Sequence, residues 1–333
     1  MEKDIEKLQA VLKEDPSNFQ ARRELSILLS KEGFNEEALS NLEFLIKYFP
    51  EDADIFYNIG ILHEKLKNFR EAEKSYKKAI KISPQEDFYY NLGEVLVSLE
   101  NYDEAIDCFK TVLKTDSQDA NCFFNIALCH YHKDEINLAT DYFQKAATIN
   151  PKDIYAHFYL GCIYQKNGLT NFAEESFKKV LSLSPDYSWA YYNLASIAYK
   201  NENYEEAKNY LLKTIEYNND DIEAFKLLTK LFVKEKNFED IISILETRLE
   251  HDENGDLYYI LSQVYKKIGN KESYAKNLNL ALENKLSLTY PALTVRKELE
   301  NLLEKESLYV EELSEYSYNE EDLDEAVEES DEN

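Results

Sequence analysis

Small and apolar residues recur along this chain at steps of three and four, the spacing of one face of an α-helix. Residues 53–85 carry two such stripes, separated at Asn68 and followed by Pro84, which cannot continue a helix. The pattern predicts two antiparallel helices whose stripes face each other. The first stripe holds Phe56, Ile59, Gly60 and His63, and the second holds Ala72, Tyr76 and Ala79.

The pair of stripes recurs with a period near 34 residues, which is typical of helical repeat arrays. One small residue keeps the period at Gly60, Gly93, Ala127, Gly161 and Ala195, and another at Ala72, Ala105, Ala139, Ala173 and Ala207. Small residues are needed where two helices come closest, because a leucine there would push the axes apart. The period predicts eight units, beginning at Phe19, Ala53, Glu86, Ala120, Ile154, Ser188, Ile222 and Gly255.

These positions resemble the tetratricopeptide repeat over most of the chain. A hydrophobic residue precedes the first small position in every unit, and five of the six prolines close a unit. Three of the seven glycines take the close-contact position, and Gly33, Gly168 and Gly269 take the turn between helices. The resemblance implies an all-α fold, a right-handed α-solenoid of about eight tetratricopeptide helix pairs with helical caps.

Both ends of the chain depart from the repeat. We expect an N-terminal capping helix in residues 1–18, eight repeats in 19–288 and a C-terminal capping helix in 289–306. A solenoid needs such caps to cover its terminal apolar faces. Repeats seven and eight carry Ile241 and Tyr274 where alanine is the rule, so their helices should pack wider or tilt.

Residues 307–333 form an acidic tail, which we expect to be disordered because it holds twelve acidic residues and no Lys or Arg. The tail could serve solubility, fold back onto the repeats, or capture a basic partner. The whole chain carries a net charge of −27, which makes nucleic acid and anionic membrane surfaces poor partners. An N-terminus without an apolar signal segment, and four cysteines without paired spacing, favour a cytoplasmic protein.

The resemblance places the first helices of successive repeats along a concave groove. We count positions from the first residue of each repeat. Position six forms a row of asparagines, whose amides could bind a peptide backbone regardless of its side chains, as in family members. The alternative is that asparagine is simply the commonest residue there in the family. The row comprises Asn58, Asn91, Asn125 and Asn193, and Tyr159 interrupts it.

Two further rows and one pair line the predicted groove. Aromatic residues at position five either contact a ligand or pack between first helices. Lysines at position 13 either complement the helix dipole or steer an acidic ligand. Tyr155 and Trp189, at position two, are an aromatic pair that could anchor an apolar side chain. The lysines are Lys31, Lys65, Lys166, Lys200, Lys234 and Lys267; the position-five residues are Tyr57, Tyr90, Phe124, Phe158, Tyr192 and Tyr259.

No pattern in the chain indicates catalysis, a metal or a cofactor. Cys129, His130 and His132 are close in sequence, but His130 takes the packing position of His63 in its own repeat. Every glycine belongs to the repeat, so none is left for a phosphate-binding loop. The carboxylate clamp of tetratricopeptide chaperone cofactors is also missing, because position five is aromatic and position two is acidic in Asp54 and Asp87.

The sequence predicts a non-catalytic scaffold or adaptor that binds an extended or helical segment of another protein, with acidic segments among the candidates. Two alternatives remain open: an architectural subunit of a larger assembly, and a regulatory subunit of an enzyme. The irregular repeats seven and eight favour the first alternative, because weakened packing marks a docking edge. The sequence leaves the oligomeric state and the partner unspecified.

Overall fold

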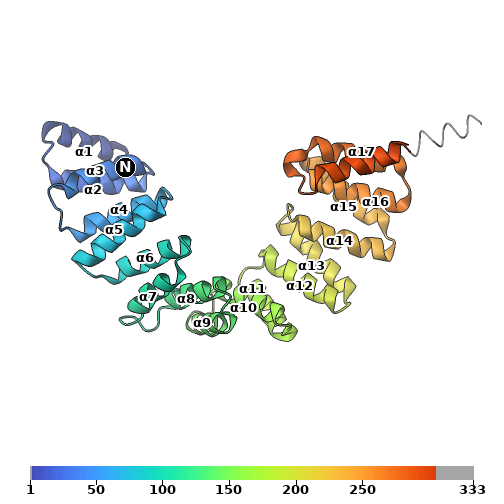
Figure 1. The fold of residues 1–333 in the computed structure, drawn as a ribbon, viewed down its shortest axis with the longest axis horizontal. Helices are drawn as coiled ribbons and strands as arrows, with labels where there is room; N and C mark the ends of the chain where they lie inside the picture. Colours follow the sequence, from blue (N-terminus) through green and yellow to red (C-terminus); the bar gives the residue numbers. More distant parts are fainter. Residues whose placement is uncertain (1, 305–333) are drawn as a thin grey trace, which may run out of the picture. The chain divides into compact units, whose positions relative to one another are not determined.

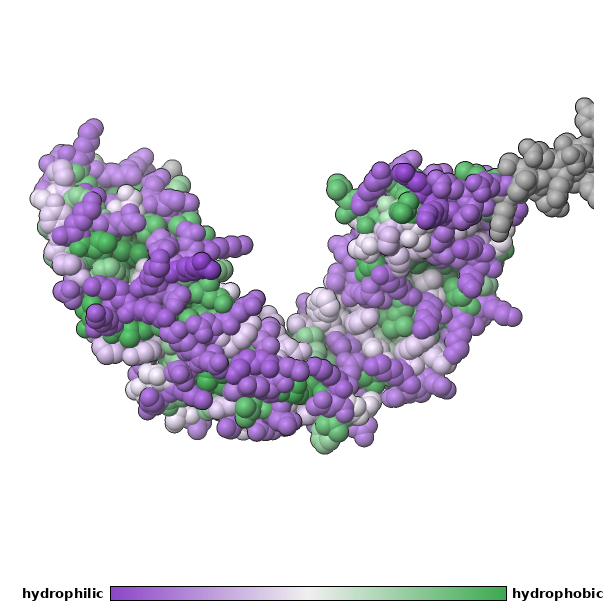
Figure 2. All heavy atoms as spheres, viewed as in Figure 1, coloured by the Kyte–Doolittle hydropathy of each residue, from purple (hydrophilic) through white to green (hydrophobic). Residues whose placement is uncertain are grey.

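The computed structural model describes residues 2–304, which form helices and no strand. This confirms the predicted all-α solenoid class. The chain divides into two compact units, Met1–Leu183 and Ser184–Asn333, whose helices are labelled in Figure 1. Hydrophilic residues cover most of the visible surface of each unit, with small groups of apolar residues between them (Figure 2). The acidic tail, residues 307–333, lies outside the described residues.

In the first unit, α1 (Glu2–Glu14) precedes five helix pairs. We call the members of a pair its first and second helix, and they pack against each other. The pairs are α2 (Phe19–Lys31) with α3 (Asn35–Ile46), α4 (Ala53–Lys65) with α5 (Phe69–Ile82), α6 (Glu86–Ser98) with α7 (Tyr102–Val112), α8 (Ala120–His132) with α9 (Ile136–Ile149), and α10 (Ile154–Lys166) with α11 (Thr170–Leu183).

The second unit holds three pairs, then the short 3-10 helix η1 (Lys285–Ser287) and a helical segment over residues 292–304. The first helix of all eight pairs begins at the residue that the period predicts. None of the helices in residues 2–304 has the length and apolarity that a membrane span requires. The pairs are α12 (Ser188–Lys200) with α13 (Tyr204–Tyr217), α14 (Ile222–Glu235) with α15 (Phe238–His251), and α16 (Gly255–Ile268) with α17 (Lys271–Glu283).

The small residue at position eight makes room for a large side chain of the second helix. A Cβ on Gly60 would lie 2.5 Å from the Tyr76 ring, and one on Gly93 would lie 2.7 Å from the Phe109 ring. Tyr76 and Phe109 are fully buried at position 24 of their repeats. The alternation of small and large residues therefore sets how closely the two helices of a pair approach.

Position 15, in the turn between the paired helices, has left-handed backbone in every repeat. Glycine adopts this conformation in three repeats, for example at Gly33 with φ +88°. The other five repeats place a residue with a Cβ there, at a steric cost of about 1 kcal/mol each. These residues are Lys67, Glu100, Asp134, Glu202 and Lys236.

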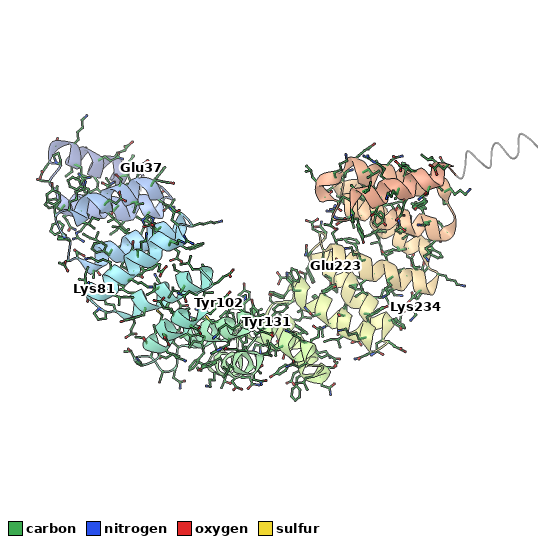
Figure 3. All side chains as sticks on the ribbon, viewed as in Figure 1. Glu37, Lys81, Tyr102, Tyr131, Glu223 and Lys234 are labelled. Atoms are coloured by element: carbon green, nitrogen blue, oxygen red, sulfur yellow. The ribbon has the colours of Figure 1, made fainter. Side chains whose placement is uncertain are left out.

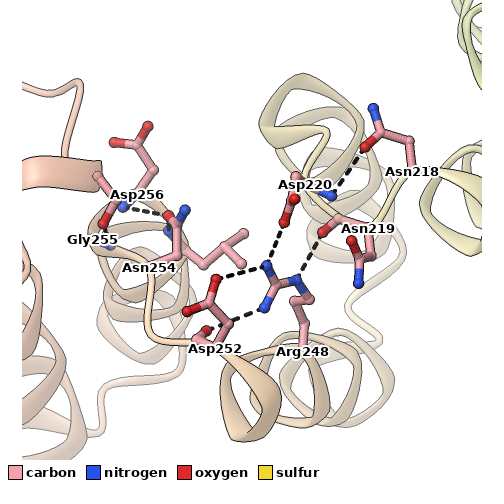
Figure 4. Close-up of polar contacts among 10 residues, drawn as sticks. Asn218, Asn219, Asp220, Arg248, Asp252, Asn254, Gly255 and Asp256 are labelled. Atoms are coloured by element: carbon pink, nitrogen blue, oxygen red, sulfur yellow. Dashed lines mark hydrogen bonds and ion pairs between the residues drawn. The ribbon is translucent and has the colours of Figure 1, made fainter. Parts of the chain in front are cut away.

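Three side chains in the second unit depart from the repeat. Ile241 and Tyr274, at position 20, are buried in the core of this unit. Arg248 takes position 27, where the other repeats have aliphatic residues or threonine, and is 8% exposed. Its guanidinium donates to the carbonyl oxygens of Asn219 and Asp252 and to the carboxylates of Asp220 and Asp252 (Figure 4). Arg248 thereby ties the α13–α14 connection to the end of α15.

The residues after α17 fold back onto the start of α16. The amide of Gly255 donates to Ser287 Oγ at 2.8 Å, and the buried Asp256 carboxylate accepts from the amide and hydroxyl of Thr289 at 2.7 and 2.8 Å. A Cβ on Gly255 would lie 2.5 Å from the carbonyl oxygen of Asn284. The last repeat is therefore stabilised by hydrogen bonds to residues that follow α17.

Candidate functional site

In the first unit, hydrogen bonds join neighbouring first helices, and positions two, five, six, nine, twelve and thirteen of each first helix lie on one side of it and form a surface. We call this surface the first-helix face. Two of the predicted asparagines connect neighbouring repeats on it. Asn91 Nδ2 donates to the hydroxyl of Tyr57 at 3.1 Å, and Asn125 Nδ2 donates to the hydroxyl of Tyr90 at 3.2 Å. Each of these two hydrogen bonds joins a first helix to the first helix of the preceding repeat.

The other two predicted asparagines bond only within their own helix. Asn58 Nδ2 donates to the carbonyl oxygen of Asp54 at 2.7 Å, and Asn193 Nδ2 donates to that of Trp189 at 2.8 Å. Their amide oxygens accept no hydrogen bond from the described residues. The amide oxygens of Asn91 and Asn125 accept none from the described residues either, so each of the four asparagines keeps its amide oxygen as an acceptor for a ligand.

The aromatic residues at position five pack inside the repeats. Tyr57 stacks on Phe88 of the next repeat, with ring centroids 4.6 Å apart, and contacts Tyr76 at 5.7 Å. Phe124 contacts Phe143 at 5.4 Å and Tyr159 at 6.0 Å. Tyr159 interrupts the asparagine row, and position five of the repeat before it is Phe124. Phe124 has no hydroxyl to which an asparagine could donate. The geometry favours the packing role that the sequence left open.

The six predicted lysines are exposed at the ends of the first helices, and three of them contact the preceding repeat. Lys65 Nζ donates to the carbonyl oxygen and hydroxyl of Ser30 at 3.1 and 2.9 Å. Lys166 pairs with Asp134 at 3.2 Å. Lys234, at the opposite end of α14 from Glu223 (Figure 3), lies 3.6 Å from the centre of the Tyr204 ring. Lys31, Lys200 and Lys267 form no ion pair with residues 2–304.

The first-helix face also carries acidic groups. Burial raises the pKa of Glu94, at position nine, and the nearby charge of Glu64 adds to the effect. Glu64 accepts a hydrogen bond from the hydroxyl of Tyr76 at 2.9 Å. The face is therefore not a continuous positive strip, and its negative part lies at repeats two and three.

Tyr155 and Trp189 are both exposed, by 59% and 55%, as an apolar contact site requires. Tyr155 belongs to the first unit and Trp189 to the second. Each of them remains a predicted ligand contact in its own unit.

A hollow of about 550 Å³ lies between α2 and α4 on the first-helix face. We call it the α2–α4 hollow. Ile27 is half exposed in it, and the predicted contacts Lys31 and Asn58 also line it. The sequence predicted Lys31 and Asn58 as separate ligand contacts. It did not predict the aliphatic pair Ile27 and Ile61 at position nine. Two successive isoleucines at a groove position were the available signal.

Cys122, Cys129 and His130 lie in the core, whereas His132 is exposed. Burial, the largest cause, raises the pKa of the Cys122 and Cys129 thiols to about 12, so both are neutral at pH 7. His130 is buried, bonds to Glu135 through Nδ1 and stacks on Tyr142. His132 stacks on Tyr102 of the preceding repeat, with ring centroids 5.5 Å apart. In residues 2–304, no three side chains of metal-binding type gather around one point.

Comparison with known proteins places the repeat pattern in a family. Models of the tetratricopeptide repeat match residues 53–86, 87–119, 120–153 and 166–231, about half of the chain. A comparison with curated proteins found no match to this chain.

Solved structures share the fold. The C-terminal part of a repeat-containing protein from Cytophaga hutchinsonii is 20% identical over 69% of this chain and 95% of its own, with a TM-score of 0.59. Yeast Tom70 is 16% identical over 82% of this chain and 59% of its own, with a TM-score of 0.53. A tetratricopeptide repeat protein from Parabacteroides merdae is 18% identical over 76% and 99%, with a TM-score of 0.51. The helix pairs, their period and these matches together assign the chain to the tetratricopeptide repeat family.

Proposed function

We propose that this protein is a non-catalytic scaffold or adaptor, and that its first-helix face binds an extended or helical segment of another protein. The observation that carries the proposal is the α2–α4 hollow, an open site on the face that the family resemblance assigns to ligands. Apolar lining with a few polar groups is the usual composition of a binding site. Asn58, which lines the hollow, has an amide oxygen free to accept from a backbone N–H.

The test is a peptide selection on the immobilised full chain, followed by titration of the enriched peptides. We expect Asn58→Ala to bind them about fivefold more weakly, because a lost hydrogen bond costs about 1 kcal/mol. Asn171→Ala, an exposed site on α11, is the matched control and should leave affinity unchanged. Equal affinities for Asn58→Ala and the control would argue against the first-helix face.

One observation favours a second function, an architectural subunit that docks through the end of the second unit. Leu286 is fully exposed in η1, and Leu293 is 65% exposed in the helical segment that follows. Exposed leucines at the end of an array are suited to contact another subunit. Light scattering checks this function: a concentration-dependent oligomer that Leu286→Ser, Leu293→Ser dissociates would support it, and a monomer at all concentrations would oppose it.

A further inference from the structure

We infer that the α2–α4 hollow takes a segment of a partner protein in which an aliphatic side chain is followed by acidic residues. The inference rests on the proposed function and adds a place on the first-helix face and a class of ligand. It is carried by an aliphatic floor and by two ammonium groups at one end of the hollow.

The floor of the hollow is aliphatic. Ile27 and Ile61 line it at position nine of repeats one and two, and Ile27 is 48% exposed. Ile27 also borders a neighbouring depression between α1 and α2, where Leu8 contributes more apolar surface. Position nine of the third repeat is Glu94, so the aliphatic pair is confined to the first two repeats. An aliphatic ligand side chain would remove this apolar surface from water.

The unpaired positive charges of the hollow lie at one of its ends. Lys31 lines it at the last turn of α2 and forms no ion pair with the described residues. Lys65 Nζ is held at the same end by its two hydrogen bonds to Ser30, which itself lines the hollow. Arg23 is paired with Asp52, and Asp54 lies in the first turn of α4. The cationic end is therefore the end of Lys31 and Lys65.

This charge pattern selects the ligand. In a chain of net charge −27, two ammonium groups at one end of an apolar hollow form a local positive site. Acidic residues next to the aliphatic side chain would meet Lys31 and Lys65, whereas basic residues would meet like charge. Exposed ammonium groups contribute more to the choice of partner and the rate of association than to affinity.

The experiment measures binding of labelled synthetic peptides to the full chain by fluorescence anisotropy. Three peptides share one glycine–serine frame and differ at the centre: a leucine followed by two glutamates, a leucine followed by two lysines, and a serine followed by two glutamates. A fourth peptide copies residues 307–333 of this chain. We expect the leucine–glutamate peptide to bind about tenfold more tightly than the leucine–lysine and serine–glutamate peptides, because each of these lacks one of the two features. It should bind at least as tightly as peptide 307–333, in which Val310, Leu323 and Val327 are each followed by two acidic residues.

Variants locate the site. Ile27→Ser should weaken binding of the leucine–glutamate peptide about fivefold, and Lys31→Ser about threefold, the latter effect fading at high salt. The matched controls Ile268→Ser, at a 42% exposed isoleucine of the second unit, and Lys81→Ser, at an exposed lysine of α5, should leave affinity unchanged. Circular dichroism should show the same helix content in all four variants.

Several results would overturn the inference. Equal affinities of Ile27→Ser and Ile268→Ser would remove the hollow as the site. The proposed function would still stand if Tyr155→Ala, on the first-helix face outside the hollow, weakened binding of the selected peptides. No binding of the leucine–glutamate peptide up to about 1 mM would exclude this ligand class. Tightest binding of the peptide 307–333 would assign the hollow to the chain's own tail. A dimer that Ile27→Ser dissociates would assign it to a second copy.

Discussion

Asn91 and Asn125 each donate a hydrogen bond to a tyrosine hydroxyl of the preceding repeat, so their first role is to join repeats. The asparagine row could be predicted from the period, but its division into two kinds of residue could not. That division depends on whether the preceding repeat offers a hydroxyl at position five, as Tyr57 and Tyr90 do. Arg248 was missed for a related reason, because its hydrogen-bond partners lie in the α13–α14 connection and at the end of its own helix rather than on its own stripe.

Asn91→Ala should lower the free energy of unfolding by about 1 kcal/mol, because the partly buried Tyr57 hydroxyl loses its donor. Asn58→Ala removes only a bond to its own helix and should cost less than about 0.5 kcal/mol. Urea unfolding followed by circular dichroism measures both. Equal losses for the two variants would contradict the division of the row.

Glu298 is the acceptor of four groups in the last repeat. Its carboxylate accepts from Tyr274 and Tyr259 at 2.6 and 2.9 Å, from Gln263 at 3.1 Å and from Lys266 at 3.3 Å. Burial raises the pKa of Glu298, but the hydrogen bonds and the charge of Lys266 outweigh it and hold the pKa below the ordinary 4.5.

A folded-state pKa below the unfolded value means that ionised Glu298 stabilises the protein above about pH 4.5, and that this contribution is lost as the pH falls through the folded pKa. Glu298→Gln should therefore lower Tm at pH 7, and the difference from the wild type should shrink as the pH falls below 4.5. Thermal melts from pH 3 to pH 7 measure this. A Tm difference that does not change with pH would oppose the role of the charge.

At the scale of elements, the period predicted where each first helix begins, because the spacing of apolar and small residues is a local property of the sequence. The turn between paired helices was only partly predictable. Gly33, Gly168 and Gly269 indicated the turn in three repeats. Lys67 and Glu202 adopt the same left-handed backbone at position 15, but a lysine or a glutamate does not predict this conformation. The packing of the two helices imposes that conformation on whichever residue is present.

Lys67→Gly should raise the free energy of unfolding by about 0.5 to 1 kcal/mol, because glycine removes the steric cost of φ +59°. The gain exceeds the entropy that glycine adds to the unfolded chain. Lys81→Gly, in the last turn of α5, is the control and should destabilise by up to about 1 kcal/mol. Chemical denaturation compares the two variants, and a loss of stability in Lys67→Gly would contradict the prediction.

At the scale of the whole molecule, the net charge of −27 opposes the folded state through repulsion among carboxylates. Tm should therefore rise by several degrees when NaCl is raised from about 10 to about 150 mM, because the Debye length falls from roughly 30 to 8 Å. Most ion pairs of the described residues are exposed, such as Lys213 with Glu216, and lose little to screening. A Tm that falls with added salt would show that these pairs outweigh the repulsion.

The contact between the start of α16 and the residues that follow α17 has a consequence for biosynthesis. Asp256 at the start of α16 is completed by Thr289, which follows it by 33 residues in the chain. A growing polypeptide presents its N-terminal part first. During translation the Asp256 carboxylate therefore lacks the donors of Thr289 until that residue has been added, and the hydroxyls of Tyr259 and Tyr274 lack their acceptor until Glu298 follows. The last repeat is finished only when nearly the whole array has been made, so a ribosome that stalls early releases a protein with an open final repeat.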